Sequence, residues 1–508
     1  MKKRIKLLSM LLAGTLAMSC LTGCGDSKGG NNKDGESATD IEISYWHSGL
    51  DIKWLDALVK GFNEKYPEYN AYYNATASDA SAVAAFGMED TDTVDLYLVN
   101  KQYDTTYLEP LNNVLDATVE GESKSIKEKF SEAYLASEEK DGKYYTLTYG
   151  GGLIGFVYSK PLFEEAGIKQ LPRTTDELAV VCGTFLDNNI KPLCHYKVSG
   201  QYRMLNEVWF AQYEGIDNYY DFYNNPSKER MTTKDGRYEV LKVHEKINTP
   251  ENVLQGSNTD SHVSMQTKFL SGKCAMMVTG SWLSSEMSNS DKIDDFAMMK
   301  TPVISSIINK LSTVKSEPEL RKLITAIDNV TDGVEEENVY INGDAYMVDG
   351  KTVSAADWEY VKTARNSLSS SYATQSAYIP TYSNAKDGAK EFLKYMYSDE
   401  GYKLYLDALH IQMPLSLSEG EIDTSSWNQF EQNQAELFEK SERLVASSIM
   451  SKNRLFTDGG AHSFADYEFV NLMCSNNESD RISADDAWSA IVAKINDKYD
   501  NDWMMNIK

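Results

Sequence analysis

The chain has 508 residues, of which 42% are hydrophobic and 25% are charged, and its formal net charge is -26. It is long enough for two or more domains and too apolar for a disordered protein. Because nucleic acids and anionic lipid surfaces are themselves negative, the charge argues against both as partners.

The first 24 residues have the pattern of a bacterial export signal. Four basic residues precede the apolar stretch 7–21, which is too short to span a bilayer. Leu21-Thr22-Gly23-Cys24 resembles a lipobox, in which the cysteine is lipidated and becomes the new N-terminus. The alternative is an ordinary secretory signal in which Cys24 is incidental. We expect a signal peptide over 1–23, a flexible tether over 24–40 and a location on the extracellular face of the cell membrane.

Short strands alternate with helices after the tether. Alternating apolar residues predict a strand over 41–45, and residues 55–62 have the spacing of an amphipathic helix. A second strand is expected over 72–76. The apolar run 94–99 predicts a strand that is buried on both faces. This order indicates a doubly wound α/β lobe.

Ligands of such lobes bind at the carboxyl ends of the strands. The residues that directly follow the predicted strands are therefore candidate ligand contacts. They are Trp46, His47 and Ser48 after the first strand, and Asn100 and Gln102 after the third. A capping or turn role is the alternative for Ser48, and Asp95 is expected to hold a turn with its carboxylate.

Three glycines, Gly150 to Gly152, separate strands predicted over 144–149 and 153–158. Their spacing matches neither of the common phosphate-binding loops. A hinge, or a close approach of the backbone to a ligand, is the better interpretation. Tyr149 and Gly150 are therefore added to the candidate site.

The later elements are a mixture of capped helices and one further strand. Pro161 opens a short helix that Gly167 ends, and Thr174 with Glu177 predicts a capping box. A strand over 274–278 leads into the loop 279–282. Helices are expected around 389–396, around 402–409, and after the cap Ser483.

Four cysteines lie beyond the signal: Cys182, Cys194, Cys274 and Cys474. None has CxxC spacing, and no cysteine–histidine spacing is typical of zinc, so no metal or other cofactor is expected. Cys182 lies on an apolar helical stripe and is predicted to be part of the core. A Cys182–Cys194 disulfide is one pairing that the sequence leaves open.

Six stretches, taken in order, resemble the extracellular solute-binding proteins of family 1, the maltose-binding-protein-like group, from about residue 41 to about residue 415. Val94 stands where that family commonly has proline, which is a minor departure. The stretches are Ile43-Ser44-Tyr45-Trp46-His47-Ser48, Val94-Asp95-Leu96-Tyr97, Tyr107-Leu108-Glu109-Pro110-Leu111, residues 155–167, residues 269–282, and Ile379-Pro380 with Ser398-Asp399-Glu400-Gly401.

The resemblance implies a two-lobed periplasmic-binding-protein-like clamp of type II, in which each lobe is a mixed sheet flanked by helices. Lobe 1 would comprise 41–150 with about 380–415, and lobe 2 would comprise 151–379 with about 416–508. Hinge segments would cross near 150–152, within 300–380 and near 412–425. Such a protein delivers a solute, here a carbohydrate and in particular an oligosaccharide, to an ABC permease. It is expected to act as a monomer.

A neutral sugar is recognised by aromatic faces that stack on its C–H surfaces and by polar groups that bind its hydroxyls. Trp282 matches the family's tryptophan after the glycine turn, which often stacks on sugar. Tyr202, Arg203 and Trp209 are aromatic or polar enough to contribute from the second lobe. Core packing is the alternative for each of these aromatic residues.

Other functions fit the sequence less well. No nucleophile elbow, zinc-protease or kinase motif is present. A glycoside hydrolase would need a pair of carboxylates, but in a chain with 76 acidic residues such a pair is always found and does not indicate catalysis. We therefore expect no catalysis. A ligand-sensing lipoprotein of the same fold stays open as an alternative, and so does a non-sugar solute such as a polyol phosphate or a polyamine.

Overall fold

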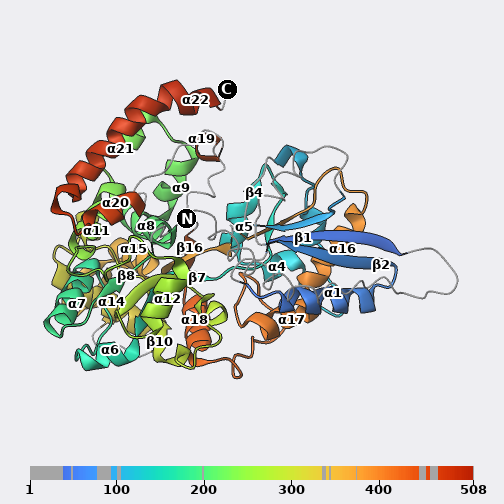
Figure 1. Ribbon diagram of the computed structural model, residues 1–508, viewed down its shortest axis with the longest axis horizontal. Helices are drawn as coiled ribbons and strands as arrows, with labels where there is room; N and C mark the ends of the chain where they lie inside the picture. Colours follow the sequence, from blue (N-terminus) through green and yellow to red (C-terminus); the bar gives the residue numbers. More distant parts are fainter. Residues whose placement is uncertain are drawn as a thin grey trace, which may run out of the picture. The chain divides into compact units, whose positions relative to one another are not determined.

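The computed structural model describes residues 38–46, 50–76, 93–99, 105–196, 200–333, 339–342, 345–372, 375–445, 454–457 and 467–506. Residues from Thr39 onward form one compact unit that contains two separate main sheets (Figure 1). The predicted α/β architecture, with two mixed sheets flanked by helices, is confirmed. No helix in the described part of the chain combines the length and the apolarity that a membrane crossing requires.

The first sheet has five strands in the order β2-β1-β3-β15-β6. β1 is parallel to β2 and β3, whereas β15 is antiparallel to β3 and β6. The predicted alternation holds in β1, because Ile41, Ile43 and Tyr45 are fully buried. The strands are β1 (Thr39–Trp46), β2 (Tyr69–Thr76), β3 (Leu96–Val99), β6 (Leu147–Thr148) and β15 (Ser376–Tyr378).

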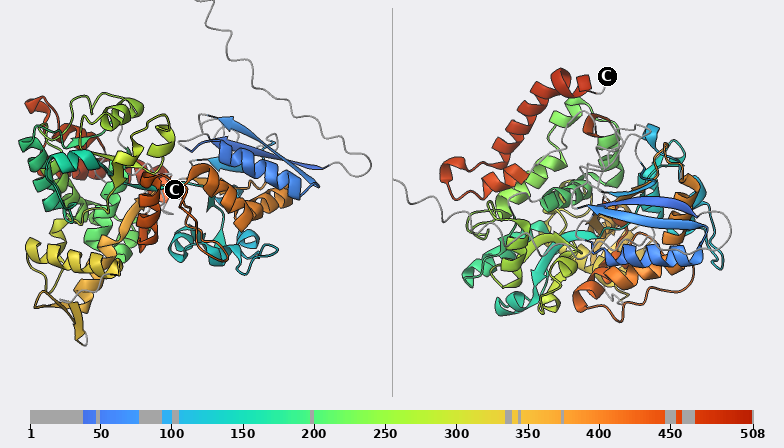
Figure 2. Two further views of the ribbon diagram at one scale, coloured as in Figure 1. Left: turned by 90° about the horizontal axis from the view of Figure 1, so that it is seen from below. Right: turned by 45° about the vertical axis from the view of Figure 1, so that its right-hand side comes forward.

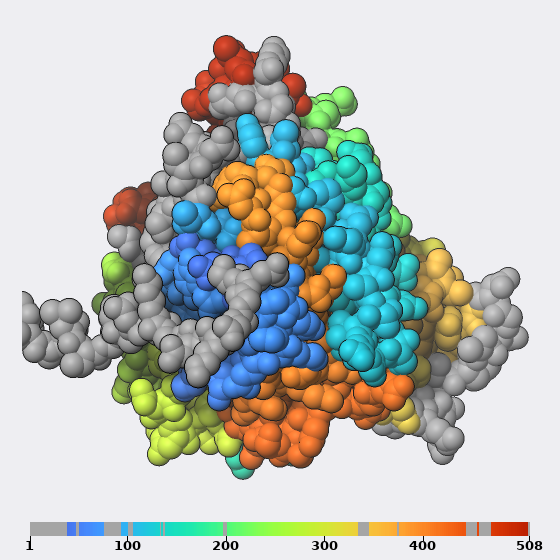
Figure 3. All heavy atoms as spheres, turned by 90° about the vertical axis from the view of Figure 1, so that its right-hand side faces the viewer, coloured from blue at the N-terminus to red at the C-terminus, as the bar shows by residue number. Residues whose placement is uncertain are grey.

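Helices from three distant parts of the sequence pack around this sheet. α1 packs against α17, and α16 packs against α1, α3 and β1. In Figure 3 the same three parts, coloured blue, cyan and orange, share one face of the molecule. The helices are α1 (Lys53–Lys65), α3 (Asn112–Leu115), α4 (Ile126–Lys129), α5 (Glu132–Glu138), α16 (Lys386–Met396) and α17 (Asp399–Leu409).

The second sheet has the order β16-β14-β7-β9-β8, and β10 also pairs with β7. Its strands are β7 (Leu153–Ser159), β8 (Leu193–Cys194), β9 (Met276–Gly280), β10 (Phe296–Met298), β14 (Ser367–Ser370) and β16 (Arg443–Val445). The long helix α8 packs across β14, β7 and β9. It carries the fully buried Tyr202, Leu205 and Trp209 inward, at helical spacing.

The remaining helices belong mainly to the second sheet. They are α6 (Lys160–Glu165), α7 (Thr175–Asp187), α8 (Gly200–Glu214), α9 (Ile216–Asn224), α10 (Lys228–Thr232), α11 (Gly236–Ile247), α12 (His262–Leu270), α13 (Leu283–Glu286), α14 (Glu317–Thr331), α15 (Ala355–Arg365), α18 (Gln429–Glu439), α19 (Arg454–Thr457), α20 (Tyr467–Met473), α21 (Ala484–Lys498) and α22 (Met504–Asn506). The C-terminal helix α21 packs against α10 and α11.

Two small sheets complete the fold. β11 (Val339–Asn342), β12 (Ala345–Val348) and β13 (Lys351–Ser354) form an antiparallel sheet next to α14 and α15, which Figure 2 shows in yellow and orange. β4 (Glu139–Lys140) and β5 (Lys143–Tyr144) form a two-stranded hairpin. The single strand predicted over 144–149 is therefore wrong, because β5 and β6 pair in different sheets.

Local hydrogen bonds explain two further differences from the predicted elements. β3 begins at Leu96 and not at Val94, because the carboxylate of Asp95 accepts hydrogen bonds from the Glu42 backbone N–H (2.9 Å) and the Ser383 hydroxyl (2.6 Å). The structural role predicted for Asp95 is confirmed. Thr174 caps α7, but the Glu177 carboxylate accepts from the Arg173 N–H instead of closing a capping box.

Three segments lead from elements of one sheet to elements of the other. They are residues 149–152 between β6 and β7, 371–375 between β14 and β15, and 410–428 between α17 and α18. The predicted glycine crossing is one of them. The return crossing between β14 and β15 lies within the range 300–380.

Hydrogen bonds join the three crossing segments. The Ser371 N–H donates to the Gly152 carbonyl (3.0 Å), and the Tyr372 hydroxyl donates to the Gln412 carbonyl (2.7 Å). Gly151 has φ +126°, and a Cβ there would lie 3.0 Å from the Tyr372 backbone. Glycine is therefore required at this position both by the backbone conformation and by the close approach of the neighbouring segment.

Candidate functional site

The register of the first sheet brings several strand ends to one edge. β1 and β3 are parallel, so Trp46 and Val99 end their strands on the same side. Ser376 pairs with both Val99 and Thr148, which places the start of the first crossing segment at this edge too. This is the position at which doubly wound α/β folds bind ligands.

Trp46 is half-buried and packs against a cluster of tyrosines on one face of this sheet. The Tyr97 and Tyr378 rings are stacked with centroids 5.7 Å apart, and the hydroxyl groups of Tyr97 and Tyr382 are 2.7 Å apart. The neighbouring side chains thus support the indole from behind. A partly exposed indole on such a support can stack on an apolar ligand face.

The second sheet has a corresponding edge, and Trp282 lies there. β8 and β9 are parallel, so Cys194 and Gly280 end their strands on the same side. Trp282 follows β9, is half-buried, and folds back over the strand end. A Cβ at position 280 would overlap the six-membered ring of Trp282. Gly280 is therefore what allows the indole to lie there.

Polar and aromatic side chains also gather between the end of β8 and the helices α12 and α13, the second of which follows Trp282 directly in the chain. Tyr196 follows β8, and its hydroxyl donates to Gln201 Oε1 (2.5 Å) at the start of α8. Its ring lies 4.8 Å from the ring of His262, the first residue of α12. Gln266 on α12 donates to Glu286 on α13 (2.7 Å). Sequence reasoning missed these residues because the two-residue strand β8 has no recognisable pattern.

Burial sets the protonation of this group. It raises the pKa of Glu286 despite the hydrogen bond from Gln266, and it lowers the pKa of His262 below 6.5. The imidazole is therefore neutral at pH 7, and its two nitrogens can act as one donor and one acceptor. Together with the Tyr196 hydroxyl and the Gln201 amide, which are also partly exposed, the imidazole can bind hydroxyl groups in both directions, whereas Gln266 is fully buried.

Arg203 lies in the first turn of α8, close in sequence to Tyr196 and Gln201. It is half-buried, and its Nε is buried without a hydrogen-bond partner among the described residues. A guanidinium N–H in this state can still donate a hydrogen bond to a ligand oxygen. Arg203 therefore stays a candidate contact.

Two predicted contacts are corrected by the structure. Tyr202 and Trp209 are fully buried in the core of the second sheet. The Tyr202 hydroxyl donates to Asn248 Oδ1 (3.2 Å), and the Trp209 indole N–H donates to the Pro302 carbonyl (2.9 Å). Packing and internal hydrogen bonds account for both residues, so we remove them from the candidate site.

The other predicted residues lie at the crossing segment or outside the described part of the chain. Tyr149 is fully buried and stacks on Trp54, with ring centroids 6.0 Å apart. Gly150 lies close to Leu50 and Tyr405, whose side chains leave no room for a Cβ. Both residues pack inside the crossing segment and do not form an exposed surface. Cys24, His47, Ser48, Asn100 and Gln102 lie outside the described residues.

A small cavity lies where the crossing segments meet. Its volume is about 20 Å³, and its lining includes Ser281, Tyr372, Gln412 and Gln434. The Gln412 Oε1 and Gln434 Nε2 atoms are buried without a hydrogen-bond partner among the described residues. The volume suits about one water molecule and not a sugar. This cavity is therefore not a candidate for a solute site.

The cysteines do not pair as the sequence allowed. All four described cysteines are buried thiols, and the neighbour of Cys194 is Cys274 and not Cys182. Among the described residues no group of three or more histidine, cysteine, aspartate or glutamate side chains is arranged to hold a metal ion.

The chain matches the model of the bacterial extracellular solute-binding protein family over residues 48–403, which is more than half of its length. It therefore belongs to this family, and the predicted membership in family 1 is confirmed. The family binds solutes and is not enzymatic, which also confirms the prediction that the chain is not an enzyme.

Among curated proteins, binding proteins of Brucella abortus and Brucella suis are each 26% identical over 164 residues, which are 32% of this chain. The match spans 38% of the length of these relatives. Solved structures share the fold at low identity. RafE of Streptococcus pneumoniae has a TM-score of 0.60 at 13% identity and covers 92% of this chain and 99% of its own. A family 1 protein of Bifidobacterium longum subsp. infantis has a TM-score of 0.53 at 17% identity, with coverages of 90% and 99%.

Proposed function

We propose that this extracellular protein binds a carbohydrate, in particular an oligosaccharide, between Trp46 and Trp282, and delivers it to an ABC permease. The observation that carries the proposal is a pair of half-buried indoles, one at the carboxyl edge of each main sheet. Stacked indoles bind the C–H faces of sugar rings, while neighbouring polar groups bind the hydroxyls.

Three kinds of support favour a sugar over a charged solute. The polar residues near the end of β8 and on α12 form a mixed set of amides, a tyrosine hydroxyl and a neutral imidazole. Proteins of the same fold include RafE, solved in complex with raffinose, a chitin oligosaccharide binding protein with a TM-score of 0.58, and GacH, solved with acarbose. The net charge of -26 argues against phosphorylated solutes.

The mechanism in this proposal is closure of a clamp. Lobe 1 is built on the first sheet and lobe 2 on the second, and the segments 149–152, 371–375 and 410–428 act as the hinge. A ligand that contacts both tryptophans only in the closed state shifts the population toward that state. The permease then recognises the closed form. Cys24 would hold the protein at the membrane through its lipid, so that release occurs next to the permease.

A thermal-shift screen of residues 39–508 tests the ligand class. The screen uses mono- and oligosaccharides, with polyamines and polyol phosphates as the other two arms. A ligand that binds only the folded state raises the melting temperature by mass action. We expect a shift from one class of sugars and none from the charged arms. A shift from a polyamine or a polyol phosphate alone would contradict the sugar proposal.

Two tryptophan variants separate binding from folding. Trp282→Ala should abolish the shift. Trp358→Ala is the matched control. The Trp358 indole lies on α15, is 3% exposed and stacks on the Tyr346 ring with centroids 4.2 Å apart, so it is part of the core and not of a strand edge. The control should lower the melting temperature of the free protein and keep the ligand-induced shift. Loss of the shift in both variants would remove Trp282 from the site.

A further inference from the structure

We propose that Cys194 and Cys274 form a disulfide bond in the secreted protein. Cys194 ends β8, and Cys274 lies two residues before β9 begins at Met276. The two Sγ atoms are 2.7 Å apart. An S–S bond is about 2.05 Å long, so closing it requires only a small side-chain movement.

Main-chain hydrogen bonds hold the two segments that carry the cysteines next to each other. Leu193 pairs with Met276 in the parallel ladder, and the Ala275 N–H donates to the Lys191 carbonyl (2.9 Å). The chain segments that carry the two cysteines are thus neighbours through main-chain hydrogen bonds. Bond formation does not require strands to separate or to change register.

The surroundings of the pair exclude other partners. Both side chains are fully buried in an apolar cluster with Met265, Phe269 and Met277. Burial raises the pKa of the Cys274 thiol well above its usual value, because a thiolate there would be desolvated. A neutral buried thiol reacts slowly, so the bond forms during folding, before the helices around β9 cover it.

The other two cysteines provide an internal contrast. Cys182 lies on α7 in a different buried cluster, and Cys474 contacts His195 Nε2 (3.6 Å) and Asn258 Oδ1 (3.6 Å). Among the described residues, neither forms a hydrogen bond with Cys194 or Cys274. We therefore expect one disulfide and two thiols.

The chemistry is thiol–disulfide exchange with an acceptor disulfide, either a small-molecule disulfide or the active site of a thiol oxidoreductase. One thiolate attacks the acceptor and releases one acceptor thiol, which leaves a mixed disulfide on the protein. The second cysteine then displaces the other acceptor thiol. Two protein thiols lose two protons and two electrons, and the acceptor disulfide becomes two thiols. Disulfides persist in extracellular proteins because their compartment is oxidising.

The bond would close a loop across 80 residues that includes α8 to α12. A covalent link of this span lowers the entropy of the unfolded chain and so stabilises the fold. It also ties the end of β8 to the start of β9. Tyr196 follows the first strand and Trp282 the second, so the bond would hold one side of the candidate site.

Thiol counting tests the proposal directly. Residues 39–508 are exported through a heterologous cleavable signal, denatured without reductant, and alkylated. We expect two alkylated residues, Cys182 and Cys474, and a linked peptide pair that contains Cys194 and Cys274. Reduction before alkylation should label all four. Four labelled cysteines without reduction, or a linked pair that includes Cys182, would overturn the proposal.

Melting temperatures give a second, independent readout. Reductant should lower the melting temperature of the exported wild-type protein by roughly 5 °C. The Cys194→Ala/Cys274→Ala variant should melt at the lower temperature and not respond to reductant. Cys182→Ala is the control, and it should respond like the wild type. An equal response in the double variant and the wild type would contradict the bond even if that variant is less stable.

Discussion

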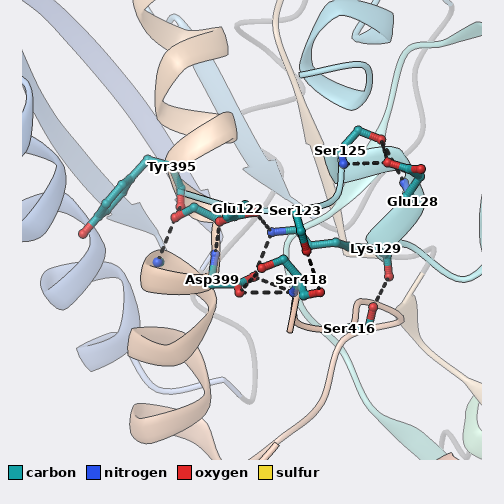
Figure 4. A network of polar contacts seen from close by, with 11 residues as sticks. Glu122, Ser123, Ser125, Glu128, Lys129, Tyr395, Asp399, Ser416 and Ser418 are labelled. Carbon is teal, nitrogen blue, oxygen red and sulfur yellow. Dashed lines mark hydrogen bonds and ion pairs between the residues drawn. The ribbon is translucent and has the colours of Figure 1, made fainter. Parts of the chain in front are cut away.

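Two buried polar networks, one in each half of this protein, differ in their chemistry: one is charged and the other is neutral. Beside the first sheet, a fully buried ammonium group, Lys129 Nζ, lies 2.5 Å from Glu122 and 3.1 Å from Asp399 (Figure 4). Ser418 donates to Asp399 from its N–H (2.9 Å) and its hydroxyl (2.6 Å). Charges on α4 and α17 thus fix the crossing segment 410–428 to the first sheet.

One buried network beside the second sheet is built from neutral groups. His244 lies between two amides, since its Nδ1 accepts from Asn248 Nδ2 (2.7 Å) and its Nε2 lies 2.5 Å from Asn206 Oδ1. A second imidazole, His195, is also fully buried. Burial lowers the pKa of His195 to about 4 and that of His244 to about 3. Protonation of His244 would set its Nδ1–H against an amide donor, so the network holds only the neutral ring.

The two networks should respond to different changes. The charged network is sensitive to removal of a partner, because an unpaired charge would be left in the interior. The neutral network is sensitive to acid, because the unfolded histidines bind protons that the folded ones exclude. Substitutions therefore test the contribution of the charged network to stability, and a pH series tests that of the neutral network.

Removal of the buried ammonium group should have the largest effect. Lys129→Met leaves Glu122 and Asp399 facing each other without a cation, and we expect the free energy of unfolding to fall by about 3 kcal/mol or more. Urea denaturation measures this change. Lys127→Ala on the same helix is the control, because Lys127 is exposed and should cost less than about 1 kcal/mol. Equal effects of the two substitutions would contradict a stabilising role of the network.

The second-largest effect should come from acid, which should destabilise the part of the fold that contains the buried histidines. The folded pKa values of His195 and His244 lie below the unfolded value of 6.5, so their contribution is complete above pH 6.5 and declines as the pH falls toward 4. Each histidine should lower the free energy of unfolding at pH 4 by on the order of 3 kcal/mol. Urea titrations at a series of pH values measure this loss.

Asp399 in the first half should respond to acid in a lower pH range than the histidines. Burial opposes ionisation of Asp399, but the hydrogen bonds from Ser418 and Lys129 prevail and lower its pKa below 3.8. Its contribution is therefore present above the unfolded pKa and is lost only as the pH falls through the folded value. Asp399→Asn should keep the decline between pH 6.5 and 4. A free energy of unfolding that stays constant over that range would contradict the prediction, because the folded histidines would then bind protons as readily as the unfolded ones.

Gly280→Ala should act on the candidate site with a smaller effect on stability. The new methyl group would displace the Trp282 ring, at a cost of about 1–3 kcal/mol. We expect ligand affinity to fall at least tenfold in calorimetry. Gly183→Ala is the matched control, because Gly183 is an exposed helical residue with open space around its Cα. It should stabilise the protein by about 0.5 kcal/mol and leave affinity unchanged.

The smallest effect should come from the helix caps, one in each half. The Ser398 hydroxyl accepts from the Gly401 N–H at the start of α17, and Thr174 accepts from the Glu177 N–H at the start of α7. Each alanine substitution should cost about 1 kcal/mol. Thr174→Ala should cost more, since the Thr174 hydroxyl donates to the Glu317 carboxylate (2.8 Å), whereas the Ser398 hydroxyl donates to the neutral Tyr395 carbonyl (2.7 Å). A larger loss for Ser398→Ala in thermal unfolding would contradict this order.

The sequence was most informative where one local pattern determines one element. The alternation of Ile41, Ile43 and Tyr45 predicted β1, and the apolar stripe of Cys182 with the cap Thr174 predicted α7. It was least informative where pairing decides the structure. Nothing local distinguishes β5 from β6, or identifies the two-residue strand β8, because their hydrogen-bond partners are distant in sequence.

The same limit applies to the site. Trp46 and Trp282 follow strands with clear patterns, so their place at the strand ends was predictable. Tyr202 and Trp209 looked equally suitable by composition, yet the helical face that carries them packs on the second sheet. Gln266 and Glu286 meet only because α12 and α13 flank β9. Residue type alone does not separate a stacking surface from a core.

Isothermal titration of the tryptophan variants tests the central claim most directly. The sugar that gives the largest thermal shift is titrated into residues 39–508 as wild type, Trp46→Ala, Trp282→Ala and the double variant. If the two indoles hold one ligand, each single variant should lose at least tenfold in affinity, and the double variant should show no measurable binding. Wild-type affinity in either folded single variant would contradict a site formed by both sheet edges.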